Sequence, residues 1–97
     1  MSRKFNVKVE SDVLVVLREE AFTPAFMEQF RENFFSFDEL HEHAEHIGRL
    51  LASGMMEDVG RGFGDDQFVE GYGRIGDFVR QATLEGTDAT STKESAA

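Results

Sequence analysis

The sequence predicts an α+β fold: an antiparallel sheet of three to four strands with two consecutive helices inserted after an N-terminal hairpin. Residues 4–17 have strand patterning, residues 23–54 have apolar side chains at helical spacing, and strand-like segments return after residue 66. A chain of 97 residues is expected to form one domain. We place that domain at residues 1–84 and a disordered C-terminal tail at residues 85–97.

The predicted hairpin comes first in the chain. Residues 4–10 alternate between apolar and polar side chains, as a half-buried strand does. Ser11 and Asp12 can form a turn. The VLVVL run at residues 13–17 is typical of a strand covered on both faces. The second strand should therefore lie nearer the centre of the sheet than the first.

A first helix is predicted to begin after Thr23. Threonine is a good N-cap, and Pro24 suits the first helical position because the N–H it lacks would have no partner there. Its apolar face is expected to consist of Phe26, Met27, Phe30 and Phe34.

A second helix is predicted between Ser36 and Gly54. Ser36 and Glu39 have the spacing of a capping box, and Gly54 suits the position just after a helix because it adopts positive φ at no steric cost. The apolar face repeats at three- and four-residue steps through Phe37, Leu40, Ala44, Ile47 and Leu51.

The remainder of the chain has weaker patterns. Residues 55–66 contain three glycines and predict a loop, and residues 67–72 predict a third strand. Residues 77–84 fit either a short helix or a strand, and we favour a fourth strand because it would cover more of the VLVVL segment. From Glu85 onward the chain lacks large apolar side chains, which predicts the disordered tail.

Composition restricts the possible functions. The chain has no cysteine, so disulfides, thiolate metal sites and thiol catalysis are excluded. It has no apolar run long enough for a membrane span and no secretory signal pattern, so we expect a cytoplasmic protein. The net charge of −9 disfavours direct binding of nucleic acid and favours a basic partner, although acidity also serves solubility alone.

No motif indicates catalysis or a cofactor. His41, His43 and His46 lie among glutamates, but their spacing is not that of an H-E-x-x-H zinc site. A solvated polar face is the favoured interpretation, and a metal site is the alternative. The glycine run at residues 60–64 is followed by two aspartates, which would repel phosphate, so it is interpreted as a connector. We therefore predict no enzyme activity, no metal and no cofactor.

One charged feature favours partner binding. Eight acids, here called the acidic belt, face only Arg49 and Arg61 between residues 36 and 66, a local net charge of −6. The belt consists of Asp38, Glu39, Glu42, Glu45, Glu57, Asp58, Asp65 and Asp66. Carboxylates three or four residues apart on a helix are spaced on the scale of backbone phosphates, so such a row can occupy a groove lined by Lys and Arg. A solvated helix face is the alternative interpretation.

The aromatic side chains divide into two expected groups. Most phenylalanines are assigned to the core because they fall on the predicted apolar faces. These are Phe5, Phe26, Phe30, Phe34 and Phe37. Phe63 and Tyr72 are expected to be exposed and to contact a partner together with the acidic belt.

The acidic row and the FTPAFMEQF segment at residues 22–30, in a small acidic domain without cysteine, support a resemblance. The chain resembles small phage-borne anti-CRISPR and anti-restriction proteins. This resemblance implies a non-enzymatic inhibitor that docks on a basic nucleic-acid-binding groove of a host defence complex and mimics nucleic acid. The alternative is a small oligomeric or adaptor module of a prophage or plasmid, which would bind through Phe63, Tyr72 or a sheet edge.

Overall fold

A computed structural model describes residues 2–60 and 64–91 and confirms the α+β class. Its elements are β1 (Val7–Leu17), the 3₁₀ helix η1 (Glu19–Ala21), α1 (Pro24–Asn33), α2 (Leu40–Ala52), β2 (Phe68–Val69), β3 (Gly73–Arg74), the 3₁₀ helix η2 (Ile75–Asp77) and β4 (Val79–Ser91). The strands form two antiparallel pairs, β1–β4 and β2–β3. The prediction of three to four strands in one sheet is therefore wrong.

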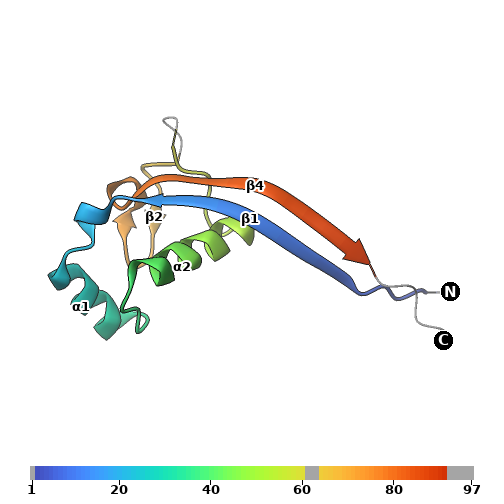
Figure 1. Cartoon of the computed structure of the whole chain (residues 1–97), viewed down its shortest axis with the longest axis horizontal. Helices are drawn as coiled ribbons and strands as arrows, with labels where there is room; N and C mark the ends of the chain where they lie inside the picture. The colour runs from blue at the N-terminus through green and yellow to red at the C-terminus, as the bar shows by residue number, and fades with distance from the viewer. Residues whose placement is uncertain (1, 61–63, 92–97) are drawn as a thin grey trace.

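The first and last strands of the chain form one long ribbon (Figure 1). β1 runs without a turn through Ser11 and Asp12, so the predicted N-terminal hairpin is wrong. Its partner is β4, with Val7 opposite Ser91 and Val15 opposite Ala82. The predicted fourth strand is present, and it is longer than expected. Residues 85–91, which we had assigned to a disordered tail, belong to it, while residues 92–97 lie outside the described chain.

Two irregularities curve this ribbon. The register skips Glu85 between Gly86 and Leu84, and it skips Arg80 between Gln81 and Val79. An extra residue on one strand bends that strand and increases its local twist. The end of the ribbon at Leu17 and Val79 lies against the helices, and we call this part of the molecule the body. The ribbon accordingly curves over α2 in the body, whereas its other end extends away from it (Figure 1).

Both helices begin with a side-chain cap. Thr23 Oγ1 accepts a hydrogen bond from the Phe26 N–H at 3.1 Å, and Pro24 is the first residue of α1, as predicted. The capping box of α2 is formed by Glu39 and Glu42, not by Ser36 and Glu39. The helix therefore begins at Leu40, and its N-cap lies three residues later than predicted, because a glutamate at the N-cap position satisfies the same free N–H groups.

The core lies between the helices, the β2–β3 hairpin and the body half of the ribbon. Its buried apolar residues are Phe22, Phe30, Ile47, Leu51, Met56, Val59, Val69, Tyr72, Ile75, Val79 and Ala82. Val13, Val15 and Leu17 pack against them from one face of β1. Leu14 on the other face is 43% exposed, so the VLVVL segment is covered on one face and not on both.

The predicted third strand, residues 67–72, is instead a tight hairpin. β2 and β3 contribute two residues each, and the turn between them contains Gly71 at φ +93°. A Cβ atom at Gly71 would lie 2.6 Å from Cε2 of the buried Phe30 ring. The hairpin can therefore pack this closely on α1 only with glycine at the turn.

Gly71→Ala is expected to lower the free energy of unfolding by about 2 kcal/mol or more, because it adds a clash to the positive-φ strain of about 1–2 kcal/mol. Gly73→Ala is the matched control, since Gly73 also has positive φ but has nothing within 4 Å of its added Cβ. Urea unfolding of the two variants measures the difference. An equal loss in both would contradict the close contact with Phe30.

Candidate protein-docking site

The structure places His43 and Tyr72 in the core. Tyr72 is 5% exposed and His43 is fully buried, and the Tyr72 hydroxyl lies 2.7 Å from His43 Nδ1. The prediction of Tyr72 as an exposed contact residue is therefore wrong. Phe63, the other predicted aromatic contact, lies outside the described residues. Aromatic rings surround the imidazole, with Phe30 and Phe37 at centroid distances of 4.7 and 5.0 Å.

Burial shifts both groups away from their charged forms. Loss of water lowers the pKa of His43 to about 4, with a smaller contribution from the nearby His46. Burial also raises the pKa of Tyr72. Both side chains are thus neutral at pH 7. The Tyr72 hydroxyl and His43 Nδ1 share one hydrogen bond, and the tautomer of the neutral imidazole sets which of them donates.

The histidines do not converge on a metal. His41 is exposed, His43 is buried and His46 is half-buried, so the three side chains occupy different environments. Within residues 2–60 and 64–91, no group of three His, Asp or Glu side chains is placed to hold a metal ion. A closed site needs three or four convergent ligands, so the described geometry does not favour the metal alternative.

The helical half of the acidic belt is less regular than predicted. Only Glu42 and Glu45 lie within α2. Glu42 Oε1 accepts hydrogen bonds from the N–H groups of Asp38 (2.8 Å) and Glu39 (3.1 Å), which lower the pKa of Glu42. This carboxylate therefore caps the N-terminus of α2 and is not fully available to a partner.

The other acids of this half of the belt are exposed, and the Glu39 carboxylate also takes part in the α2 capping box. Asp38, Glu39 and Glu45 are exposed. Arg31 Nε lies 3.8 Å from Asp38, and Arg49 lies 4.0 Å from Glu45. Exposed pairs at these distances contribute little, so a basic partner could displace either arginine at small cost.

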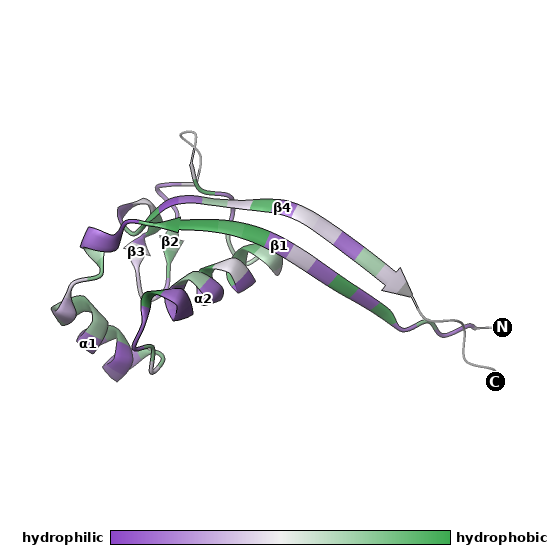
Figure 2. Ribbon diagram, in the orientation of Figure 1, coloured by the Kyte–Doolittle hydropathy of each residue, from purple (hydrophilic) through white to green (hydrophobic). Residues whose placement is uncertain are grey.

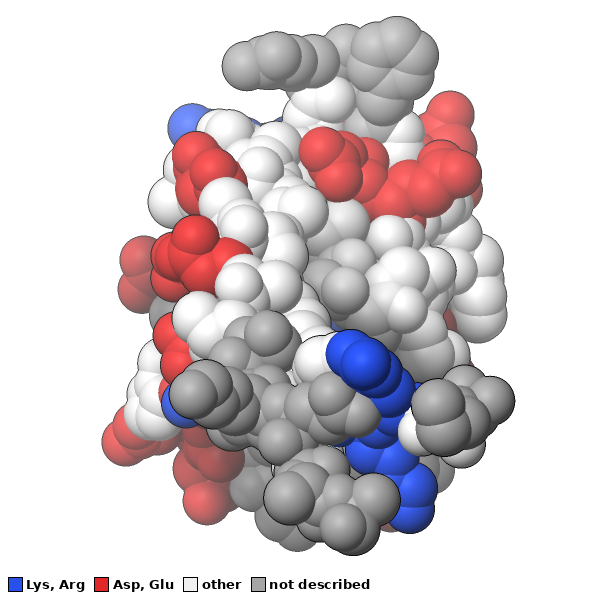
Figure 3. All heavy atoms as spheres, turned by 90° about the vertical axis from the view of Figure 1, so that its right-hand side faces the viewer, with Lys and Arg blue, Asp and Glu red and all other residues white. Residues whose placement is uncertain are grey.

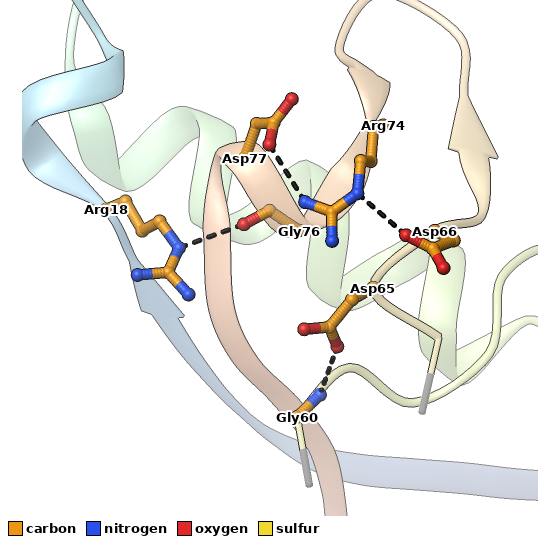
Figure 4. Close-up of polar contacts among 7 residues, drawn as sticks. All are labelled: Arg18, Gly60, Asp65, Asp66, Arg74, Gly76 and Asp77. Atoms are coloured by element: carbon orange, nitrogen blue, oxygen red, sulfur yellow. Dashed lines mark hydrogen bonds and ion pairs between the residues drawn. The ribbon is translucent and has the colours of Figure 1, made fainter. Parts of the chain in front are cut away.

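Two acids in the loop half of the belt make hydrogen bonds within the chain (Figure 4). Asp66 accepts from Arg74 Nε at 2.8 Å, and Asp65 accepts from the Gly60 N–H at 3.2 Å. Arg74 also donates to Asp77 at 2.8 Å, which places its guanidinium between two carboxylates.

Glu57 and Asp58 complete the loop half. Their side chains are exposed, and neither carboxylate has an ion pair within the described chain. Among the loop acids, these two therefore have no ion pair within the described chain that a basic partner would have to displace.

Acidic side chains do not form one continuous row on the face of the molecule at the ends of β1 and β4 (Figure 3). Figure 3, which shows the end of the molecule at the termini, has Asp and Glu in separate groups at opposite sides with uncharged surface between them. A phosphate chain is continuous along its length, so on this face close mimicry of nucleic acid is not supported. The acids are better suited to flank a contact made by other side chains.

Exposed apolar side chains supply such a contact surface. A groove of about 370 Å³ lies where the end of α1 meets α2 and the β2–β3 hairpin. Its apolar walls are Phe34, Phe35, Leu50, Met55, Phe68 and Val69, and we call this surface the aromatic groove. Phe68 is 77% exposed and Met55 is 75% exposed. Large apolar side chains gathered at such exposure indicate a docking surface more often than isolated ones do.

The polar groups of the aromatic groove are few. Asn33, His46 and Glu70 line it with the apolar residues. Burial, and then the neighbouring Arg49, lower the pKa of His46, so its imidazole is neutral at pH 7. Glu70 is then the charged residue of the lining, and neither Lys nor Arg is among the lining residues. The groove thus favours an apolar side chain accompanied by positive charge.

The sequence missed this groove because its residues belong to different elements. Phe34 and Phe5 had been assigned to the core, yet they are 42% and 56% exposed. Helical spacing placed Phe34 on the apolar face of α1, but the helix ends at Asn33 and Phe34 follows it. The consecutive phenylalanines at residues 34 and 35 were a usable signal, since a chain that leaves a helix cannot bury both.

Comparisons with protein-family models, with curated proteins and with solved structures gave no match. α2, the longest helix in the described part of the chain, has 13 residues, and no helix there is long and apolar enough to cross a membrane.

Proposed function

We propose that this protein is a non-enzymatic inhibitor that docks on a basic, nucleic-acid-binding surface of another protein or ribonucleoprotein complex. The aromatic groove anchors an apolar side chain of the partner, and the accessible acids of the belt face the surrounding lysines and arginines. An anti-CRISPR or anti-restriction role is the specific form of this proposal. The observation that supports it most is an exposed aromatic groove with a carboxylate and without a cation in its lining.

Charge and apolar surface have separate roles in this proposal. Accessible carboxylates at Asp38, Glu39, Glu45, Glu57 and Asp58 attract a basic partner and speed its encounter. The groove supplies the buried anchor, because a few central aromatic contacts usually carry most of the binding energy. The adaptor alternative uses the same groove but assigns no role to charge, so the two differ in their dependence on salt.

Phe68→Asp is expected to weaken binding by about thirtyfold or more, which is the effect of losing a central anchor worth about 2 kcal/mol. The partner is first captured from the native source and purified, and its affinity for each variant is measured at low and high salt. Double-stranded DNA and RNA are then added as competitors. Wild-type binding should weaken steeply with salt, and one of the two nucleic acids should compete.

Leu84→Asp is the matched control. Leu84 is 48% exposed but does not line the aromatic groove, so its replacement should leave affinity unchanged. A purified partner that binds equally well at high salt, and that nucleic acid does not displace, would favour the adaptor alternative. Equal binding by wild type and Phe68→Asp would overturn the groove as the docking site.

A further inference from the structure

The far half of the β1–β4 ribbon lacks cover. Residues 7–12 and 86–91, here called the arm, pair with each other, and every described side chain in the arm is exposed. The first described residues of the chain and Ser91, the last residue of β4, lie at its outer end (Figure 1). The Cα radius of gyration is 17.0 Å, compared with about 13 Å for a compact chain of this length. An isolated two-stranded ribbon is only marginally stable in water, so the arm needs a partner surface.

The arm carries apolar side chains on one face. Side chains alternate along a strand, so Val7 and Val9 continue the face on which Val13 and Val15 pack against the core. Figure 2 shows the continuous apolar segment of β1 giving way to alternation in the arm. Val7 is 56% exposed and Val9 is 59% exposed. α2 therefore covers this face only over the body.

The outer edge of β1 is also open. β4 occupies one edge of β1, and along the other edge β1 has no strand partner within the described chain. An unpaired edge presents free N–H and C=O groups to another strand. The open edge and the uncovered apolar face thus lie on the same six residues of β1.

We propose that two copies of this chain associate through their arms, with β1 pairing antiparallel to β1 of the second copy about a two-fold axis at Val9. The four strands then form one sheet in the order β4–β1–β1–β4. Val9 lies opposite Val9, and Phe5 lies opposite Val13 of the second copy. Phe5 thereby reaches the apolar groove between β1 and α2, which includes Val13, Val15, Gly48 and Ala52. This inference does not depend on the proposed function.

Charge selects this register. With Val9 at the axis, Lys8 of each copy lies opposite Glu10 of the other, and these two side chains already pair at 2.9 Å within one chain. Shifting the centre of pairing by one residue places Lys8 opposite Lys8, or Glu10 opposite Glu10. Opposite charges directly across a ladder stabilise it, and like charges destabilise it. A two-fold contact must be complementary to itself, and this segment meets that condition.

A cysteine cross-link tests the arrangement directly, since the chain has no cysteine of its own. Residues opposite each other in an antiparallel ladder have Cα atoms about 4.5–5.5 Å apart, within the range that a disulfide spans. Val9→Cys should therefore form a disulfide-linked dimer under mild oxidation. Glu57→Cys, an exposed position on the body, is the control and should remain largely monomeric.

Charge reversal provides an independent test by sedimentation over a range of concentrations. Lys8→Glu should weaken dimerisation by about tenfold or more, because two attractive cross-chain pairs become repulsive. The double variant Lys8→Glu/Glu10→Lys restores opposite charges and should recover the dimer. A wild-type chain that is monomeric throughout would overturn the proposal. So would cross-linking at Ala89→Cys in preference to Val9→Cys, because that result would place the contact on β4.

Discussion

Replacing Phe30 by alanine is expected to lower the free energy of unfolding by about 3–5 kcal/mol. Phe30 is 2% exposed and lies where α1 meets the rest of the core. Its ring centroid is 5.6 Å from that of Phe37 and 5.1 Å from that of Tyr72. The substitution therefore removes contacts to two neighbouring segments and leaves a cavity that the fixed backbone cannot close. Domains of this size are stable by only about 5–15 kcal/mol, so the loss is a large part of the total.

Urea unfolding followed by circular dichroism measures this effect. The midpoint should fall by about 2 M if the slope is about 2 kcal/mol per molar urea. Phe68→Ala is the matched control, because Phe68 is 77% exposed and its truncation should change stability by less than about 0.5 kcal/mol. A similar loss in both variants would mean that Phe30 is not the centre of the aromatic core.

The helices were predictable because their signals are local. Two adjacent residues, Thr23 and Pro24, define the start of α1. The apolar side chains that predict α2 all lie in or next to that one helix. The cap of α2 was misplaced because two pairs have capping-box spacing. Glu39 lies three residues after Ser36, and Glu42 lies three residues after Glu39. Only the backbone conformation at Glu39, which is extended, decides between them.

The strands were not predictable in the same way because their partners are distant in sequence. Ser11 and Asp12 resemble a turn, yet they continue β1 because Thr87 and Gly86 pair with them. Residues 85–91 have no large apolar side chain, and their strand is held by backbone hydrogen bonds that composition does not reveal. An alternation rule detects burial, and the arm is not buried within one chain.

The candidate site was predictable in its charge but not in its shape. Counting residues located the acids, and four of the eight, Asp38, Glu45, Glu57 and Asp58, are exposed without a structural hydrogen bond to the backbone or to Arg74. Counting residues could not show that the Glu42 carboxylate caps the N-terminus of α2 or that Asp66 pairs with Arg74. Tyr72 was misassigned because its turn position suggests exposure, whereas its hydroxyl has a hydrogen-bond partner in the core at His43.

Acidification is expected to destabilise the protein through His43. The pKa of this imidazole is about 4 in the folded chain because burial opposes its charge, whereas an unfolded histidine has a pKa of about 6.5. The unfolded state therefore binds the proton first as the pH falls below 6.5. Stability is fully present above that value and declines toward pH 4, by about 2 kcal/mol between pH 7 and 5 and about 3 kcal/mol by pH 4.

The double variant His43→Leu/Tyr72→Phe should remove the part of this dependence that comes from His43 and leave the part that comes from His46, whose pKa burial also lowers. Replacing both partners leaves no unpaired polar group in the core, which is why the pair is changed together. His41→Leu removes an exposed imidazole and should retain the wild-type pH dependence. Urea unfolding at pH 7 and pH 5 measures all three proteins. NMR of the wild-type imidazoles provides a test that does not require the double variant to fold. If the His43 signals titrate near pH 6.5 in the folded protein, the buried neutral imidazole is not the cause of acid sensitivity.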